Sequence, residues 1–154
     1  FYSYVVVDVA QLISNLEGVK PEQWFEADRT LAAEVIHNLI HLIATVSPGA
    51  KRGSTAPYAY AHFMMLEWGA AQPRTLANAF HRPVPLNGEG VLLNTYRALG
   101  RYVEQMDRMH GKLTERRVAA IDLPGDVQDQ LQVDAMVSVP ELADWASEKI
   151  RQGA

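Results

Sequence analysis

The chain has 154 residues, 48% of them hydrophobic, which fits a single domain over residues 1–154 with a real core. A formal net charge of −4 and a pI near 5.7 argue against nucleic-acid binding by bulk electrostatics, so any such contact must be local. The absence of cysteine excludes disulfides, thiolate zinc sites and cysteine nucleophiles. Without an apolar run of about 18 residues, we expect a soluble, cytoplasmic protein.

The first predicted element is a strand over residues 1–9, which is rich in Tyr and Val and has an unbroken Val5-Val6-Val7 typical of burial on both faces. Because the chain opens in strand-like sequence without a methionine, we expect a fragment of a longer protein. Asp8 is suited to cap a short helix over residues 10–16, and Gly18 is suited to end it.

A long helix is predicted from about Pro21 to Val46, because proline suits a first helical turn and Ser47-Pro48-Gly49 suits a helix end. Apolar residues at helical spacing form its expected core-facing stripe: Ala32, Val35, Ile36, Leu39, Ile40, Leu42, Ile43 and Val46. A strand is then predicted from Tyr58 to Trp68, apolar on both faces.

A short basic loop separates this helix from this strand and contains Lys51, Arg52, Gly53, Ser54 and Thr55. Two cations, two hydroxyls and a flexible backbone could bind an anion. The same cations could simply complement the negative end of the helix dipole, and local chemistry alone favours this plain helix exit. A nucleotide-triphosphate loop is excluded, because that motif needs lysine directly before the hydroxyl residue and Gly53 stands there.

The second half of the chain predicts four elements and leaves the segment from Gly125 to Val137 ambiguous. They are a short helical piece over residues 75–80 capped by Thr75, a helix over 89–110, a strand over 114–123 and a final helix with a Ser138–Glu141 capping box. An irregular connection is expected over residues 81–88. Strands separated by helices indicate an α+β fold, with an antiparallel or mixed sheet packed with helices.

Histidines are the residues that an enzyme or metal site would use. His37 and His41 lie four residues apart, a spacing that lets two imidazoles share a metal, with Glu34 as a third ligand. Asn38, however, stands where the metalloprotease motif needs glutamate. A polar face toward solvent or a neighbouring subunit is the alternative, and His62 is predicted to be a core or interface histidine. We expect no catalytic residue, metal or cofactor, while a small α/β enzyme or metal-binding fragment using His37 and His41 stays open.

Three blocks, residues 1–12, 43–52 and 76–80, together resemble the C-terminal half of a known subunit. They are similar, in order and separation, to the CasC-type backbone subunit of Cascade, the RNA-guided surveillance complex of type I-E CRISPR systems. The resemblance covers about the first 85 residues well and the rest loosely. It implies part of an RRM-like, ferredoxin-like palm, whose fingers, thumb and first palm strand lie outside this chain.

The resemblance also implies a function in antiviral defence. Such a subunit is non-catalytic, oligomerises along CRISPR RNA with copies of itself and other Cascade subunits, and grips the RNA backbone while the bases pair with target DNA. Carried onto this chain, Lys51 and Arg52 would neutralise phosphates, and Ser54 or Thr55 would donate hydrogen bonds. Gly53-Ser54 departs from the longer polar residue and threonine expected there, which leaves the role of Ser54 open. Because the resemblance places half of the palm outside this chain, we expect an exposed strand edge, and such an edge predicts self-association through strand pairing or swapping.

Overall fold

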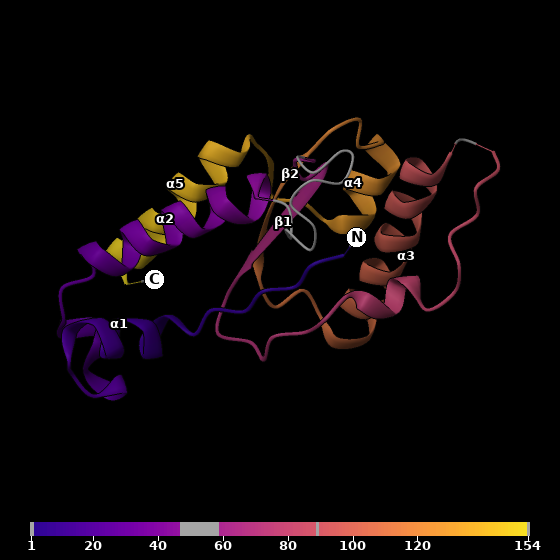
Figure 1. Ribbon diagram of the computed structural model, residues 1–154. Coiled ribbons are helices and arrows are strands. Elements are labelled where there is room, and N and C mark those ends of the chain that lie inside the picture. Colours follow the sequence, from indigo (N-terminus) through magenta and orange to yellow (C-terminus); the bar gives the residue numbers. More distant parts are fainter. Residues whose placement is uncertain (1, 47–58, 89, 154) are drawn as a thin grey trace. The chain divides into compact units, whose positions relative to one another are not determined.

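A computed structural model gives the fold of residues 2–46, 59–88 and 90–153 (Figure 1). In chain order the elements are α1 (Val9–Glu17), the 3-10 helix η1 (Pro21–Glu26), α2 (Thr30–Thr45), β1 (Phe63–Trp68), the 3-10 helix η2 (Ala77–Phe80), α3 (Val91–His110), β2 (Glu115–Ala120), α4 (Gly125–Leu131), β3 (Ala135–Met136) and α5 (Val139–Gln152). The fold is α+β, as predicted, with a mixed sheet packed against helices.

The chain divides into two compact units, one comprising Phe1–Val5 with Met65–Met136 and the other Val6–Met64 with Val137–Ala154. We call them the sheet unit and the helical unit. The sheet unit holds most of β1 with β2, β3, α3 and α4, and the helical unit holds α1, α2 and α5. A single domain over residues 1–154, forming the C-terminal part of a palm, stays a prediction.

Within the described residues, the sheet has the strand order β1-β2-β3. The strands β2 and β3 are parallel, with Arg117 opposite Ala135 and Val118 opposite Met136. The core of this unit consists of apolar side chains from β2, α3, α4 and the connecting segments: Leu76, Tyr96, Leu99, Val103, Val118, Ala119, Leu123, Val127 and Leu131. The helices α3 and α4 approach closely at Gly100, where an added Cβ would lie 2.5 Å from Gln130 Oε1.

The helical unit is built on the packing of α2 against α5 (Figure 1). Its buried apolar residues are Ile13, Ala32, Ala33, Ile36, Ile40, Ala44, Leu142, Ala143, Trp145, Ala146 and Ile150. Alanines on both helices leave out bulky side chains at the contact, which lets the two backbones lie close. This unit is therefore held mainly by apolar helix packing.

The helices with strong capping signals form as predicted. Asp8 caps α1 by accepting a 2.9 Å hydrogen bond from the Gln11 backbone N–H, and Gly18 ends the helix with a φ of 69°. In α5, the Ser138 hydroxyl and the Glu141 carboxylate form the expected capping box. The hydroxyl of Thr75 accepts a 3.2 Å bond from the Ala77 N–H at the start of η2, which also agrees with the sequence.

The prediction of one helix from Pro21 to Val46 is wrong, because η1 and α2 are separate elements. Asp28 lies at the break, where its carboxylate accepts bonds from the backbone N–H of Thr30 at 2.9 Å and from the Thr30 hydroxyl at 2.7 Å. This local bonding starts a new helix. The expected core stripe is also partly wrong: Ala32, Ile36 and Ile40 are buried, but Val35, Leu42 and Val46 are 37%, 56% and 62% exposed.

Two predicted strands also differ from the structure. Residues 2–8 have no regular secondary structure, so the strand expected over residues 1–9 is not formed there. The strand expected from Tyr58 begins only at Phe63. The ambiguous segment after Gly125 contains α4 and β3, which are too short to produce a readable period in the sequence.

Candidate nucleic-acid interface

The predicted phosphate contact, Lys51, Arg52, Ser54 and Thr55, lies outside the described residues, as does the predicted helix end at residues 47–49. The structure does describe both ends of this segment. The Ala61 N–H donates a 2.8 Å hydrogen bond to the Ala44 carbonyl in the last turn of α2. The chain that leaves α2 therefore returns to the same helix end, and the predicted basic loop is anchored there at both sides.

The residues around this anchor support it locally. The Thr45 hydroxyl donates a 2.7 Å bond to the His41 carbonyl, and the Val46 N–H donates a 2.8 Å bond to the Leu42 carbonyl. The bonds from Val46 and Ala61 satisfy two of the four carbonyl groups, those of Leu42 and Ala44, that the end of the helix would otherwise leave open. The anchor is thus part of a hydrogen-bonded helix end.

The charge of the helical unit makes the basic pair stand out. This unit carries nine Asp and Glu residues, and its Lys and Arg residues are Lys20, Arg29, Lys51, Arg52, Lys149 and Arg151. Lys51 and Arg52 are its one adjacent pair of cations, in a unit with a net negative charge. Within this unit the pair is therefore the strongest candidate that the sequence offers for a contact with a polyanion.

The histidine face of α2 does not form a metal site among the residues that the structure describes, where no group of three or more potential ligands lies together. His37 Nε2 lies 3.2 Å from Asp144 Oδ1 on α5, and the rings of His37 and His41 are 5.0 Å apart. Glu34, the expected third ligand, is exposed. His37 thus contributes to the packing of α2 with α5, and the metal-binding alternative loses its geometric basis.

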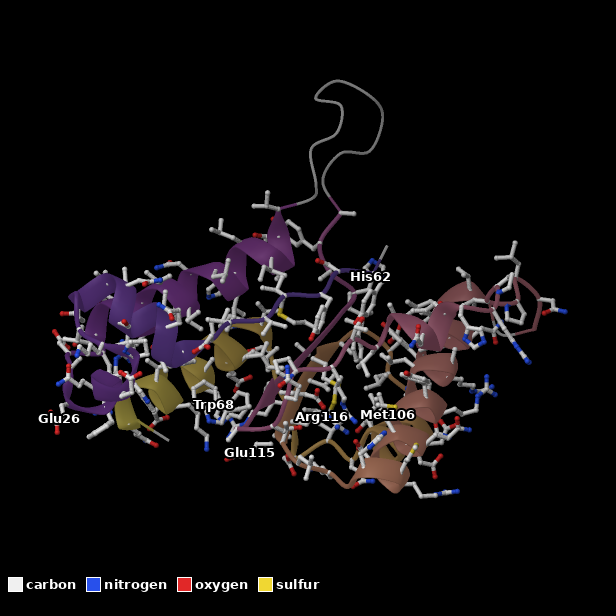
Figure 2. All side chains as sticks on the ribbon, turned by 90° about the horizontal axis from the view of Figure 1, so that it is seen from below. Glu26, His62, Trp68, Met106, Glu115 and Arg116 are labelled. Atoms are coloured by element: carbon white, nitrogen blue, oxygen red, sulfur yellow. The ribbon has the colours of Figure 1, made fainter. Side chains whose placement is uncertain are left out.

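His62 was expected inside a central strand, as a core or interface histidine. It lies before β1 begins and is exposed (Figure 2). The core position is therefore wrong, because the strand starts one residue later than His62.

A buried charge cluster occupies the sheet unit and centres on Arg116, whose side chain is 0% exposed (Figure 2). Arg116 Nη2 donates a 2.6 Å bond to Glu67 Oε1 on β1, and Nη1 donates a 2.9 Å bond to Asp107 Oδ2 on α3. Arg74 Nη2 contacts the same two carboxylates, at 3.0 Å from Glu67 and 2.7 Å from Asp107. Arg116 Nη1 also donates to the Leu131 carbonyl. We call Arg116, Arg74, Glu67 and Asp107 the arginine cluster.

Opposing effects act on the carboxyl groups of this cluster. Burial by itself raises the pKa of Glu67, but hydrogen bonds and positive charge from Arg74 and Arg116 outweigh it and lower that pKa. The same balance, with Arg116 as the stronger partner, lowers the pKa of Asp107. Both carboxyls are therefore ionised at neutral pH, which suits charge pairing and makes them poor proton donors.

The sequence predicts a strand over residues 114–123, which contains Arg116, but does not predict that the Arg116 side chain is buried. One signal was present: Arg116 is in phase with Val118 on β2, and both are buried while Glu115 is exposed. Side chains two residues apart on a strand face the same way. Arg116 is thus committed to internal carboxylates and is not available to an RNA phosphate.

The helix α3 carries three further arginines, Arg97, Arg101 and Arg108, and two of them lie near acids. Arg108 Nη2 lies 3.1 Å from Glu104 Oε1, and Arg97 Nε lies 3.9 Å from Asp126 Oδ2. Arg101 is exposed on the same helix. Interspersed charges of both signs are typical of a solvated helix face, so this surface is a weaker candidate for polyanion binding than the basic pair.

Comparison with known protein families identifies the family of this chain. The family model described as CT1975-like protein, a CRISPR-associated (Cas) family, matches residues 1–145. The chain belongs to this CRISPR-associated family. The match spans both compact units and includes the basic loop. The CRISPR association that the sequence suggested is therefore confirmed.

No curated protein matches the chain. The family match does not distinguish the type I-E, CasC-type subunit from other members, so that assignment is a proposal. In the described ranges, none of the helices has the length and apolar character needed to cross a membrane.

Proposed function

We propose that this CRISPR-associated protein is a non-catalytic subunit of the CasC type in a type I-E Cascade complex, and that it oligomerises along CRISPR RNA in the cytoplasm. It grips the RNA backbone without reading sequence and leaves the bases free to pair with target DNA in antiviral defence. Its partners are the CRISPR RNA, target DNA through the guide, further copies of itself and other Cascade subunits. No cofactor takes part.

The family membership carries this proposal, because it places the chain among CRISPR-associated proteins over residues 1–145. The anchored base at Ala44 and Ala61 supports a role for the loop, because recognition loops work best when a rigid element fixes their ends. The net negative charge of the helical unit supports a local contact in place of a broad basic surface.

Chemically, the loop offers what backbone recognition needs. The ammonium of Lys51 and the guanidinium of Arg52 neutralise phosphates and release counterions. The hydroxyls of Ser54 and Thr55 donate hydrogen bonds to phosphate or sugar oxygens, which positions the strand. None of these four side chains distinguishes one RNA sequence from another when it contacts the backbone, so binding is sequence-independent.

The experiment that tests the proposal is a salt series of single-stranded RNA binding by the full-length protein. The test variant is Lys51→Glu with Arg52→Glu. The matched control is Lys20→Glu with Arg151→Glu, which makes the same change of charge at two exposed cations of the same helical unit. Two unrelated RNA sequences of equal length serve as ligands.

We expect the test variant to weaken binding equally for both RNAs and to flatten the plot of log K against log salt by about 1.4 units, since each lost single-strand phosphate contact is worth about 0.7. The control should keep the original slope. Equal effects of the two double variants would show that the loop contributes to RNA binding only through the net charge of the protein. An unchanged slope in the test variant would show that Lys51 and Arg52 do not contact RNA phosphates.

A further inference from the structure

The helix α2 carries apolar side chains on two faces. One face packs against α5, which lies along α2 in Figure 1. On the other face, Leu31, Val35 and Leu42 are 46%, 37% and 56% exposed. Together with Leu39 they recur at spacings of three and four residues, so they lie along one side of the helix. The helix is therefore suited to pack against a second partner besides α5.

This second face forms an open groove, which we call the α2 groove. It is lined by Leu31, Glu34, Val35, Asn38, Leu39 and Leu42, most of which are apolar. The volume of the groove is about 370 Å³, whereas removal of one buried leucine can leave a cavity of about 150 Å³. The groove therefore has room for a leucine side chain and part of the segment that carries it.

The irregular connection between η2 and α3, residues 81–88, presents an exposed leucine. We call this connection the Leu86 loop, and Figure 1 shows it beside α3 in the sheet unit. Leu86 is 82% exposed, the largest value among the large apolar side chains of the described chain. Burial of Leu86 against a partner would remove from water an apolar area that its own unit leaves exposed.

The backbone on both sides of Leu86 is fixed. The side-chain amide of Asn94 donates two 2.8 Å hydrogen bonds, one to the carbonyl of Pro85 and one to the carbonyl of Asn87. These are the residues directly before and after Leu86. Pro85 and Pro83 also restrict the backbone of the loop, because each proline ring fixes its φ angle. A segment that is already ordered loses less entropy on binding, so the Leu86 loop is suited to dock as a rigid body.

The charges of the loop and of the groove are complementary. Residues 81–88 contain Arg82 and neither Asp nor Glu, while the lining of the α2 groove contains Glu34 and neither Lys nor Arg. Both charged side chains belong to exposed residues. Opposite charges beside apolar surfaces orient a contact and favour the correct partner. Two α2 grooves packed face to face would instead combine two copies of Glu34 and no cation, so the Leu86 loop fits the groove better than a second groove does.

We propose that the Leu86 loop of one copy of this chain docks in the α2 groove of the next copy. The loop belongs to the sheet unit and the groove to the helical unit, so each copy offers its loop to one neighbour and its groove to another. Such a head-to-tail contact leaves a loop at one end of the assembly and a groove at the other, where further copies can be added. The inference deepens the proposed function and rests on it, because a subunit that oligomerises along RNA needs a contact that can be repeated.

Disulfide trapping without RNA tests the contact. The chain has no cysteine, so each thiol in the experiment is one that was introduced. The loop protein carries Asn87→Cys and a size tag, and the groove protein carries Asn38→Cys. Both positions are exposed, and neither change removes Leu86 or an apolar residue of the groove. The control protein carries Glu148→Cys, at an exposed position of α5 in the same unit as the groove.

Full-length loop protein is mixed under oxidising conditions with either groove protein or control protein, and the heterodimer is measured on a non-reducing gel. We expect about ten times more heterodimer with the groove protein, the size of effect that a hot-spot contact produces. Adding Leu86→Asp to the loop protein should lower the yield to the control level, because a carboxylate would then enter an apolar groove. Leu113→Asp makes the same change at another exposed leucine of the sheet unit and should leave the yield unchanged.

A charge exchange tests the orientation of the contact and does not depend on the apolar substitutions. Glu34→Arg in the groove protein should lower the yield about threefold, which is the size of an exposed ion pair. Arg82→Glu in the loop protein should then restore it, because the two charges are again opposite. Circular dichroism of each variant checks that the fold is retained.

Sedimentation of proteins without introduced thiols tests whether the contact can be repeated. The Leu86→Asp protein keeps its groove, and the Leu42→Asp protein keeps its loop. At concentrations where the unchanged protein forms species larger than a dimer, each variant alone should stay monomeric. A mixture of the two variants should stop at a dimer, because only one intact loop and one intact groove can meet.

Several results would overturn the inference. Loop and groove proteins could give no more heterodimer than the control, or a yield that Leu86→Asp does not change. The groove protein could prefer disulfide-linked homodimers, which would mean that α2 packs on α2. A disulfide could form only inside a chain carrying both thiols, which would mean that the loop docks in its own groove. The unchanged protein could fail to form species larger than a dimer. All of these measurements omit RNA and keep Lys51 and Arg52, so failure of this contact and failure of the RNA grip are distinguishable.

Discussion

The two compact units of this chain hold together by different means. The sheet unit encloses the arginine cluster, four charged side chains drawn from β1, α3, β2 and the chain between β1 and η2. The helical unit packs α2 on α5 through apolar residues and confines its stronger charge interactions to exposed helix caps. From this comparison we predict that the stability of the sheet unit depends on the ionisation of its carboxyl groups more than the stability of the helical unit does.

The largest expected effect on stability comes from replacing Arg116, the central residue of the arginine cluster. Arg116→Met removes the cation between Glu67 and Asp107 and leaves two carboxylates inside the unit with Arg74 alone. Breaking a buried ion pair from one side costs about 3–5 kcal/mol, and we expect a loss of this size in the free energy of unfolding measured by urea.

Arg101→Met is the matched control, since it makes the same substitution at an exposed position of α3 and should change stability by less than about 0.5 kcal/mol. Adding Glu67→Gln and Asp107→Asn to Arg116→Met should restore part of the loss, because the uncompensated charges disappear. A cost for Arg116→Met no larger than that of the control would show that the sheet unit does not depend on its charges.

The next effect is a difference in acid sensitivity between the two units. The folded-state pKa values of Glu67 and Asp107 are lowered from their ordinary values of 4.5 and 3.8. A lowered folded pKa contributes stability above the ordinary value, and that contribution is lost as pH falls through the folded pKa. The sheet unit should therefore keep its stability down to about pH 4.5 and lose it progressively at lower pH.

The helical unit also has carboxyls with lowered pKa values, but they belong to exposed caps. Hydrogen bonds from the backbone and hydroxyl of Thr30 lower the pKa of Asp28, and those of Ser138 do the same for Glu141. Water screens such groups, so their loss should fray helix ends without opening α2 from α5. In hydrogen exchange measured between pH 5 and pH 3, the protection factors, which correct for the slower intrinsic exchange in acid, should fall in β2 and α3 before they fall in α2 and α5. An equal fall in both units would contradict the contrast.

Sequence reasoning succeeded where structure is decided locally. The caps at Asp8, Gly18 and Ser138 each act over three or four residues, so α1 and α5 were placed correctly. It failed where residues far apart in the sequence determine the structure. Arg116 donates a hydrogen bond to Glu67, which lies 49 residues earlier, and no local sequence pattern predicts that pairing.

The same contrast applies to the candidate site. Residue types alone picked out Lys51 and Arg52 as possible phosphate contacts, but the tie between Ala61 and Ala44 that anchors their segment is a long-range fact that only the fold provides. The segment over residues 2–8 differs from its prediction for a similar reason: its composition predicts a strand and cannot say whether a partner strand is available.

The smallest expected effect tests whether caps in the helical unit act independently of its apolar packing. Ser138→Ala removes the hydroxyl that accepts a 3.3 Å bond from the Glu141 N–H, and loss of an N-cap typically costs about 1 kcal/mol. Thermal unfolding should show this modest loss, and hydrogen exchange should rise in the first turn of α5 alone. Ser3→Ala, at an exposed serine outside the helices and strands, is the control and should have no effect. If exchange instead rises along the whole of α5 and α2, the cap and the packing form one cooperative structure, and the two units differ less than their interactions suggest.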